Sequence, residues 1–246
     1  MVQALQRTAV SGPTLVRLLA RLTAADVSAS GQSLSDQLSQ WLGWTDAIGL
    51  STALNSKPPA VASGARAAGS AEGECVRLRA SLTDAIAGDS MLAPRRRRSA
   101  AQAQHAQAEA EVRYADFRQC YLALQQGMET RIGNLRGRLR SMVAAQSSEM
   151  TRLAVVDAIM ERALGARERS LFGAVPGMLG GHFERLRKAA QEELAAAGDD
   201  PAPAPTAVAN GAWLDVFRKD MQSVLLAELE IRFQPVEGLL AALRIS

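Results

Sequence analysis

Residues 114–142 read YADFRQCYLALQQGMETRIGNLRGRLRSM and carry the most regular apolar pattern of the chain. Their large apolar residues recur in steps of three or four, at Tyr114, Phe117, Tyr121, Leu124, Met128, Ile132, Leu135, Leu139 and Met142. These steps place one apolar stripe along an α-helix, and the stripe shifts once, between Met128 and Ile132. The pattern is typical of a coiled-coil seam.

The helix that carries this seam extends beyond it in the prediction, because no proline occurs between Ser99 and Gln146. One helix over that range would be about 70 Å long, which is more than the diameter of a compact domain of this size. No segment shows the alternation of a β-strand. We therefore expect an all-α, elongated protein, built on a long central coiled-coil-like helix or on an antiparallel helical stack. The seam needs a covering partner, so self-association as a homodimer is expected, although packing within one chain would use the same stripe.

Proline- and glycine-rich stretches divide the chain into predicted parts. We expect an N-terminal helical segment (1–55), a flexible linker (56–74), a central long-helix region (75–197), a Pro/Ala linker (198–211) and a C-terminal helix (212–246). In the first part, Ser33 and Asp36 form a weak capping signal for a helix. Helix breaks are expected around Pro176, where five glycines lie between 165 and 181, and at Pro235.

Composition excludes several classes of protein. The 246 residues have a net charge of +3, and the mean hydropathy of −0.04 comes without an apolar run of membrane length. The N-terminus has no export signal pattern, so a cytoplasmic protein is expected. Cys75 and Cys120 are too few and too far apart for a disulfide framework or a metal site. His105 and His182 have no ligand partners at metal-binding spacing, so we expect no enzyme, no cofactor and no metal.

Basic residues form three clusters, and nearly all of them are arginine, because lysine occurs only three times in the chain. The clusters are Arg95, Arg96, Arg97 and Arg98; then Arg131, Arg136, Arg138 and Arg140; and then Arg185, Arg187 and Lys188. Arginines on helices can contact nucleic-acid phosphates. However, no recognition-helix motif and no interleaved aromatic residues accompany them. Solvated helix faces or salt bridges between chains are the simpler interpretation, and nucleic-acid binding is the alternative.

The tryptophans are the candidate partner-binding residues. Trp41 and Trp44 would share a helix face at their spacing of three residues, either packed against the Leu15–Leu22 helix or free to bind a partner. Trp213 and Phe217 add aromatic side chains to the last helix. These four residues are the expected contacts for a protein partner.

Both ends of the chain carry a resemblance to a bacterial family. The matching segments are SGPTLVRLLARL at 11–22, QSLSDQLSQWLGWTDAIGLSTAL at 32–54 and LLAELEIRFQPVEGLLAALR at 225–244. They resemble the F subunit of the type III Zorya anti-phage defence system. The resemblance implies an accessory protein that works with a proton-driven inner-membrane motor complex and a companion cytosolic subunit. It carries no catalytic residue to this chain.

Overall fold

The computed structural model describes residues 13–24, 31–56, 67–93, 113–197 and 207–245, and the regular secondary structure in these ranges is α-helical. The helices are α1 (Thr14–Thr23), α2 (Leu34–Trp41), α3 (Trp44–Asn55), α4 (Ala67–Ala87), α6 (Tyr114–Ala144), α7 (Ser148–Ala197) and α8 (Ala207–Ile245). The predicted all-α, elongated class is confirmed. None of the helices in the described ranges combines the length and apolar character that a membrane crossing requires.

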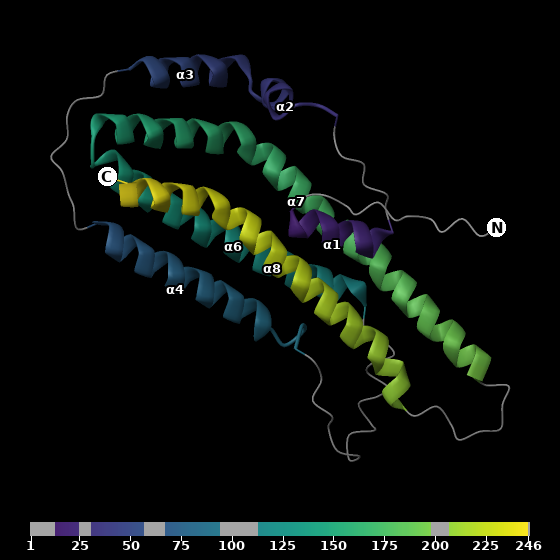
Figure 1. The fold of residues 1–246 in the computed structure, drawn as a ribbon. Helices are drawn as coiled ribbons and strands as arrows, with labels where there is room; N and C mark the ends of the chain where they lie inside the picture. The colour runs from purple at the N-terminus through teal and green to yellow at the C-terminus, as the bar shows by residue number, and fades with distance from the viewer. Residues whose placement is uncertain (1–12, 25–30, 57–66, 94–112, 198–206, 246) are drawn as a thin grey trace, which may run out of the picture.

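The core is a helical stack centred on α6 and α8, which run side by side in the same direction, while α4 and α7 pack antiparallel to them (Figure 1). Helix α6 contacts α4, α7 and α8, and a short connection folds α7 back along it. Helix α1 packs on α7 and α8, whereas α2 and α3 lie outside α7, on the side away from α4. Of the two predicted architectures, the stack is the one that forms.

The apolar seam of α6 is buried, but within a single chain. Phe117, Tyr121, Leu135 and Leu139 are completely covered by the neighbouring helices. Val143 is also buried on this side of α6. A straight α-helix has 3.6 residues per turn, so the buried stripe shifts gradually away from a strict seven-residue repeat. The expectation that a second copy of the chain packs on this stripe is therefore corrected. Helices α4, α7 and α8 of the same chain already cover the stripe.

Helix α7 runs without a break through the predicted interruption at Pro176, and this is a correction. Proline has no N–H for the carbonyl four residues earlier, which is that of Phe172. The side-chain amide of Gln125 on α6 donates to this carbonyl at 3.2 Å. The hydroxyl of Tyr114 donates to the carbonyl of Pro176 itself. Helix α6 thus supplies the missing donor and holds α7 together at the proline.

Helix α8 likewise continues through Pro235, so the expected short final helix is part of α8. Helix α4 begins at Ala67, inside the predicted 56–74 linker, and α8 begins at Ala207, inside the 198–211 linker. The capping signal at Ser33 forms as predicted, because the Ser33 hydroxyl accepts from the Asp36 amide at 3.1 Å. The basic run at 95–98 and His105 lie outside the described residues.

Candidate functional site

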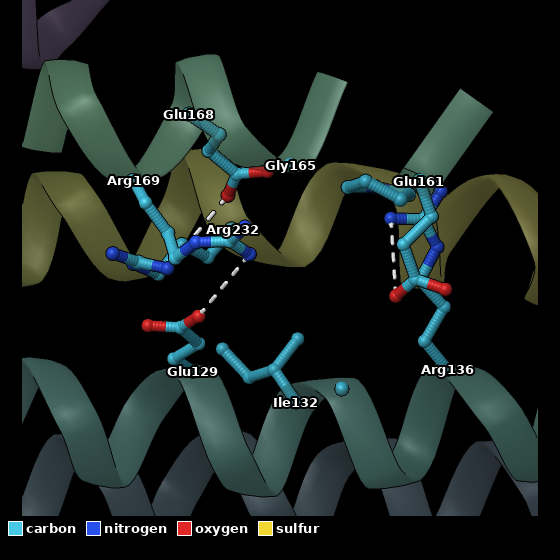
Figure 2. A pocket seen from close by; sticks show the side chains of 10 residues that line it. Glu129, Ile132, Arg136, Glu161, Gly165, Glu168, Arg169 and Arg232 are labelled. Carbon is cyan, nitrogen blue, oxygen red and sulfur yellow. Dashed lines mark ion pairs between the residues drawn. The ribbon is translucent and has the colours of Figure 1, made fainter. Parts of the chain in front are cut away.

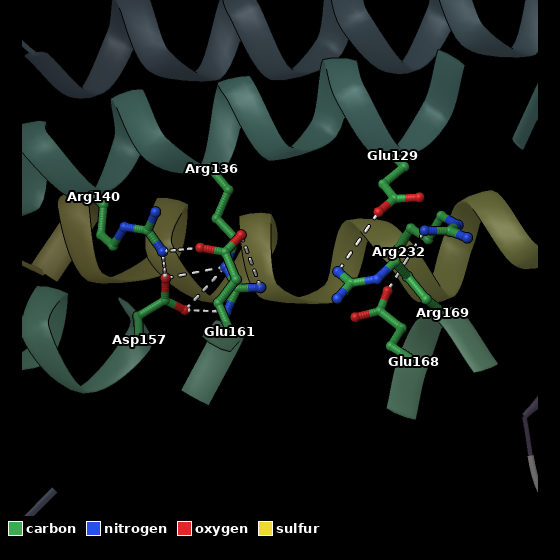
Figure 3. A network of polar contacts seen from close by, with 8 residues as sticks. All are labelled: Glu129, Arg136, Arg140, Asp157, Glu161, Glu168, Arg169 and Arg232. Atoms are coloured by element: carbon green, nitrogen blue, oxygen red, sulfur yellow. Dashed lines mark hydrogen bonds and ion pairs between the residues drawn. The ribbon is translucent and has the colours of Figure 1, made fainter. Parts of the chain in front are cut away.

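Two arginines of the second cluster, Arg136 and Arg140, face α7 of their own chain (Figure 3). Arg136 forms a bidentate ion pair with Asp157 of α7, in which Nη2 lies 2.6 Å from Oδ1 and Nε lies 3.0 Å from Oδ2. Arg140 donates to the same carboxylate at 3.1 Å and also pairs with Glu161. The side chains of Arg136 and Asp157 are each only 13 % exposed. These ion pairs fasten α6 to α7, and they occupy the donors that a phosphate would need.

The other described members of the basic clusters are also engaged within the chain. Arg138 pairs with Glu74 of α4, and Arg131 donates to the Ser81 hydroxyl at 2.8 Å. In the third cluster, Arg185 donates to the carbonyl of Leu22 at the end of α1. The two remaining members, Arg187 and Lys188, pair with acidic neighbours on α7, Glu184 and Glu192. Three of these five side chains thus form ion pairs within the chain, and the other two, Arg131 and Arg185, donate to uncharged oxygens of the same chain.

A buried polar network on α8 was not anticipated from the sequence. Glu228 is completely buried and accepts from the Tyr121 hydroxyl at 2.6 Å, from Gln125 Nε2 at 2.9 Å and from Arg232 Nε at 2.8 Å. Arg232 also stacks over the ring of Phe172, 4.2 Å from its centre. Burial, followed by the charge of Glu228, raises the pKa of the Tyr121 phenol. The network cross-links α6, α7 and α8, and its only sequence signal is the Glu–Arg spacing of four on α8.

A small pocket opens beside this network, between α6, α7 and α8 (Figure 2). It has a volume of about 110 Å³, well below the ~300–1,000 Å³ of typical small-molecule sites. Three arginines and three glutamates line it, and their charges cancel. They pair across it at 3.6–3.9 Å, as Arg136–Glu161, Arg232–Glu168 and Arg169–Glu129. The part of the chain that the structure describes contains no group of three or more His, Cys, Asp or Glu side chains suited to a metal.

Two of the four candidate partner-binding aromatics lie in the core. Phe217 is completely buried, and its ring meets that of Phe183 edge-on at 5.0 Å. Trp213 is half-buried and meets the same Phe183 ring edge-on at 5.1 Å. Tyr114 and Phe117 of α6 complete this aromatic cluster. These rings pack α8 against α6 and α7, so Phe217, which is completely buried, is not available as the partner contact that was predicted. For the half-buried Trp213 a partner contact stays a prediction.

Trp41 and Trp44 separate into different environments. Trp41 ends α2 and Trp44 begins α3, because the chain is extended at Leu42 and Gly43, so the expected shared helix face does not form. Trp41 is half-buried, with the guanidinium of Arg167 at 4.4 Å from its ring centre. Trp44 is 83 % exposed. The Leu15–Leu22 helix, α1, packs mainly on α7 and α8 rather than on α2 or α3.

The exposed Trp44 belongs to a larger surface that we call the α3 outer face. It comprises the exposed residues on the side of α3 that faces away from α7: Trp44, Thr45, Ala47, Ile48, Ser51, Thr52 and Asn55. Ile48 is 52 % exposed, and Leu54 at the edge of this face is 61 % exposed. On the opposite side, Asp46 pairs with Arg162 of α7 at 3.4 Å. Trp44 with its exposed neighbours Ala47 and Ile48 is the candidate contact for a protein partner on this face.

Comparison with known proteins gives one match. A family model described as a protein of unknown function (DUF3348) matches residues 1–245. Searches of the curated proteins and of the solved structures found no match.

Proposed function

Since the chain belongs to the DUF3348 family, whose function is unknown, its role has to be inferred from its own surface, and we propose that it is a non-enzymatic accessory subunit that acts through protein–protein contacts. The α3 outer face carries this proposal. Trp44 leaves most of its large ring in solvent, at 83 % exposure, in a chain that has only three tryptophans. Aromatic residues of this kind supply most of the binding energy at protein interfaces.

The resemblance of both chain ends to the F subunit of type III Zorya supports a place in anti-phage defence. In this proposal the protein is cytoplasmic and lies at the inner membrane through contacts with the motor complex or with the companion cytosolic subunit. The stacked core gives a rigid frame, and the α3 outer face presents the contact residues. The pocket between α6, α7 and α8 has no assigned role, because its charged groups pair with one another.

The test is protection against phage in cells that express the protein with the motor and companion subunits. Trp44→Glu places a charge in the middle of an apolar contact, so we expect plaque formation to rise by at least about tenfold, in line with the cost of losing a hot-spot residue. Leu171→Glu on α7 is the matched control, because Leu171 is also exposed, at 61 %, but lies outside α3. Full protection by the Trp44→Glu protein at wild-type abundance would refute the proposal.

The alternative is a nucleic-acid-binding effector that uses the arginine clusters. Its support is reduced, because the described arginines of the second and third clusters form ion pairs or hydrogen bonds within the chain. The test is fluorescence anisotropy with labelled double-stranded DNA over a salt titration. Tight binding with a steep salt dependence, lost on Arg95–Arg98→Ala, would favour this alternative. A flat signal at about 50 mM salt would remove it.

A further inference from the structure

We infer that the partner of the α3 outer face is a second copy of the same chain, bound through an antiparallel α3–α3 contact around a two-fold axis. The inference rests on the proposed function insofar as both use this face. In this inference the protein contact made by Trp44 is a contact with a second copy, and the motor complex or the companion subunit then binds the assembled dimer. The α3 outer face also replaces the seam of α6 as the site of self-association.

Charge is the first argument. Asp46 is the only charged residue of α3, and it points away from the outer face toward Arg162 of α7. The outer face therefore consists of apolar, hydroxyl and amide side chains. A two-fold contact places each patch against itself, so any net charge in it would be repelled by its own copy. The α3 outer face meets this requirement, whereas a partner selected by opposite charge would find no ion-pair partner there.

Shape is the second argument, and it fixes the axis. Ile48 lies midway between Trp44 and Thr52, so an antiparallel pair centred on Ile48 brings each Trp44 opposite Thr52 of the other copy. The small side chains of Ser51 and Thr52 leave room for the tryptophan ring. Large residues at one end of the face and small residues at the other are self-complementary only in this antiparallel orientation.

The weak attachment of α3 to its own chain is the third argument. Of its 12 residues only Ala53 is buried, and α2 has no buried residue. A helix with apolar residues on more than one side is normally covered on more than one side. Helix α7 covers the inner side: Arg162 pairs with Asp46, and the Ile159 side chain lies 3.5 Å from where a Cβ atom at Gly49 would be. In Figure 1 no described helix lies beyond α3 on its other side. A second α3 would supply that cover.

The experiment is a mass measurement by size-exclusion chromatography with light scattering, on the full chain over a concentration series. We expect a species of twice the 26.1 kDa chain mass. Trp44→Glu and Ile48→Glu should each shift it to one chain mass, with unchanged helical circular dichroism. Leu171→Glu should keep the dimer. A wild-type protein that stays monomeric at every concentration, or a dimer that survives both α3 substitutions, would overturn the inference.

Cross-linking tests the axis independently of stability. A cysteine at the two-fold axis faces its own copy, so Ile48→Cys should form a covalent dimer under mild oxidation. Val216→Cys on α8, at a residue of comparable exposure (48 %), should not. The native chain is the background control, since Cys75 is buried and Cys120 half-buried. Equal cross-linking at both positions would contradict the α3 contact.

The two proposals can fail separately. A monomeric wild-type protein whose Trp44→Glu variant loses phage protection would refute the self-contact and keep the proposed function, with another protein as occupant. A dimer that Trp44→Glu dissociates without any loss of protection would do the reverse.

Discussion

The buried carboxylate of Glu228 on α8 holds α6, α7 and α8 in register. Glu228 has no contact with solvent, and an isolated carboxylate in such a position would be strongly unfavourable. Three donors from α6 and α8 satisfy it, and Arg232 neutralises its charge. Removing any one of the three donors would leave the buried Glu228 carboxylate with an unsatisfied oxygen or an uncompensated charge, so the three hydrogen bonds are expected to stabilise the fold together.

Arg232→Met tests this dependence. The substitution leaves Glu228 buried without its counter-ion, so we expect the free energy of unfolding to fall by about 3–5 kcal/mol in chemical denaturation. Arg187→Met, which removes a half-exposed pair with Glu184, should cost less than about 1 kcal/mol. Adding Glu228→Gln to Arg232→Met removes the uncompensated charge and should restore part of the stability. Strictly additive losses in this cycle would show that the two side chains do not act as a pair.

The Cys120 thiol provides a test of the electrostatics near α4. Burial, together with its 3.3 Å hydrogen bond to the Asp89 carboxylate, raises its pKa from 9.0 to about 12. The thiolate is the reactive form, so at pH 8 the folded protein should alkylate at Cys120 at least ~100-fold more slowly than the unfolded chain. As pH rises, the thiol ionises in the unfolded chain before it does so in the folded protein. The contribution of the Cys120 thiol to the free energy of unfolding is therefore complete below pH 9 and is lost between pH 9 and 12. Asp89→Asn should speed alkylation, and an unchanged rate would contradict this origin of the shift.

At the scale of one element, α7 is shaped by what α6 inserts into it. The ring of Tyr114 lies against the turn from Pro176 to Gly180, and a Cβ atom added at Gly180 would come within 2.9 Å of that ring. The glycine is therefore required by a close contact, although glycine weakens a helix interior.

Gly180→Ala should lower the free energy of unfolding by about 1–3 kcal/mol, because the ring of Tyr114 would have to move and give up its bond to the Pro176 carbonyl. Gly177→Ala is the matched control on the same helix. A Cβ there meets nothing within 4 Å, so the better helix propensity of alanine should stabilise the protein by up to about 1 kcal/mol. The two melting temperatures should move in opposite directions, and a parallel change would be inconsistent with the Tyr114 contact.

The helices themselves were predictable because their signals are local. The steps of three and four in α6 and the Ser33 cap both depend on neighbours along the chain. The breaks at Pro176 and Pro235 were wrongly predicted, since at Pro176 the missing donor comes from Gln125 on another helix. The acidic partners of Arg136 were invisible for the same reason: Asp157 lies 21 residues away, on α7.

For the whole molecule, burial is distributed unevenly between a stacked core and an outer layer. Helices α4, α6, α7 and α8 share one apolar core, to which α1 adds Leu15 and Leu22. Helices α2 and α3 contribute Ala53 as their single buried residue. Because local opening costs little where few apolar contacts are lost, the outer layer should open independently of the core.

Hydrogen exchange measured by mass spectrometry on the Ile48→Glu variant tests this division, since the introduced charge removes the proposed α3 self-contact. Peptides from 34–55 should exchange at least about 100-fold faster than peptides from 117–143, because residues such as Phe117 and Leu139 in the second group are completely buried. Wild-type protein at high concentration should protect 44–55 and leave 117–143 unchanged. Equally slow exchange of both segments in the variant would mean that contacts with α7 are enough to stabilise α2 and α3. The weak attachment of α3 would then no longer be an argument for the α3–α3 contact.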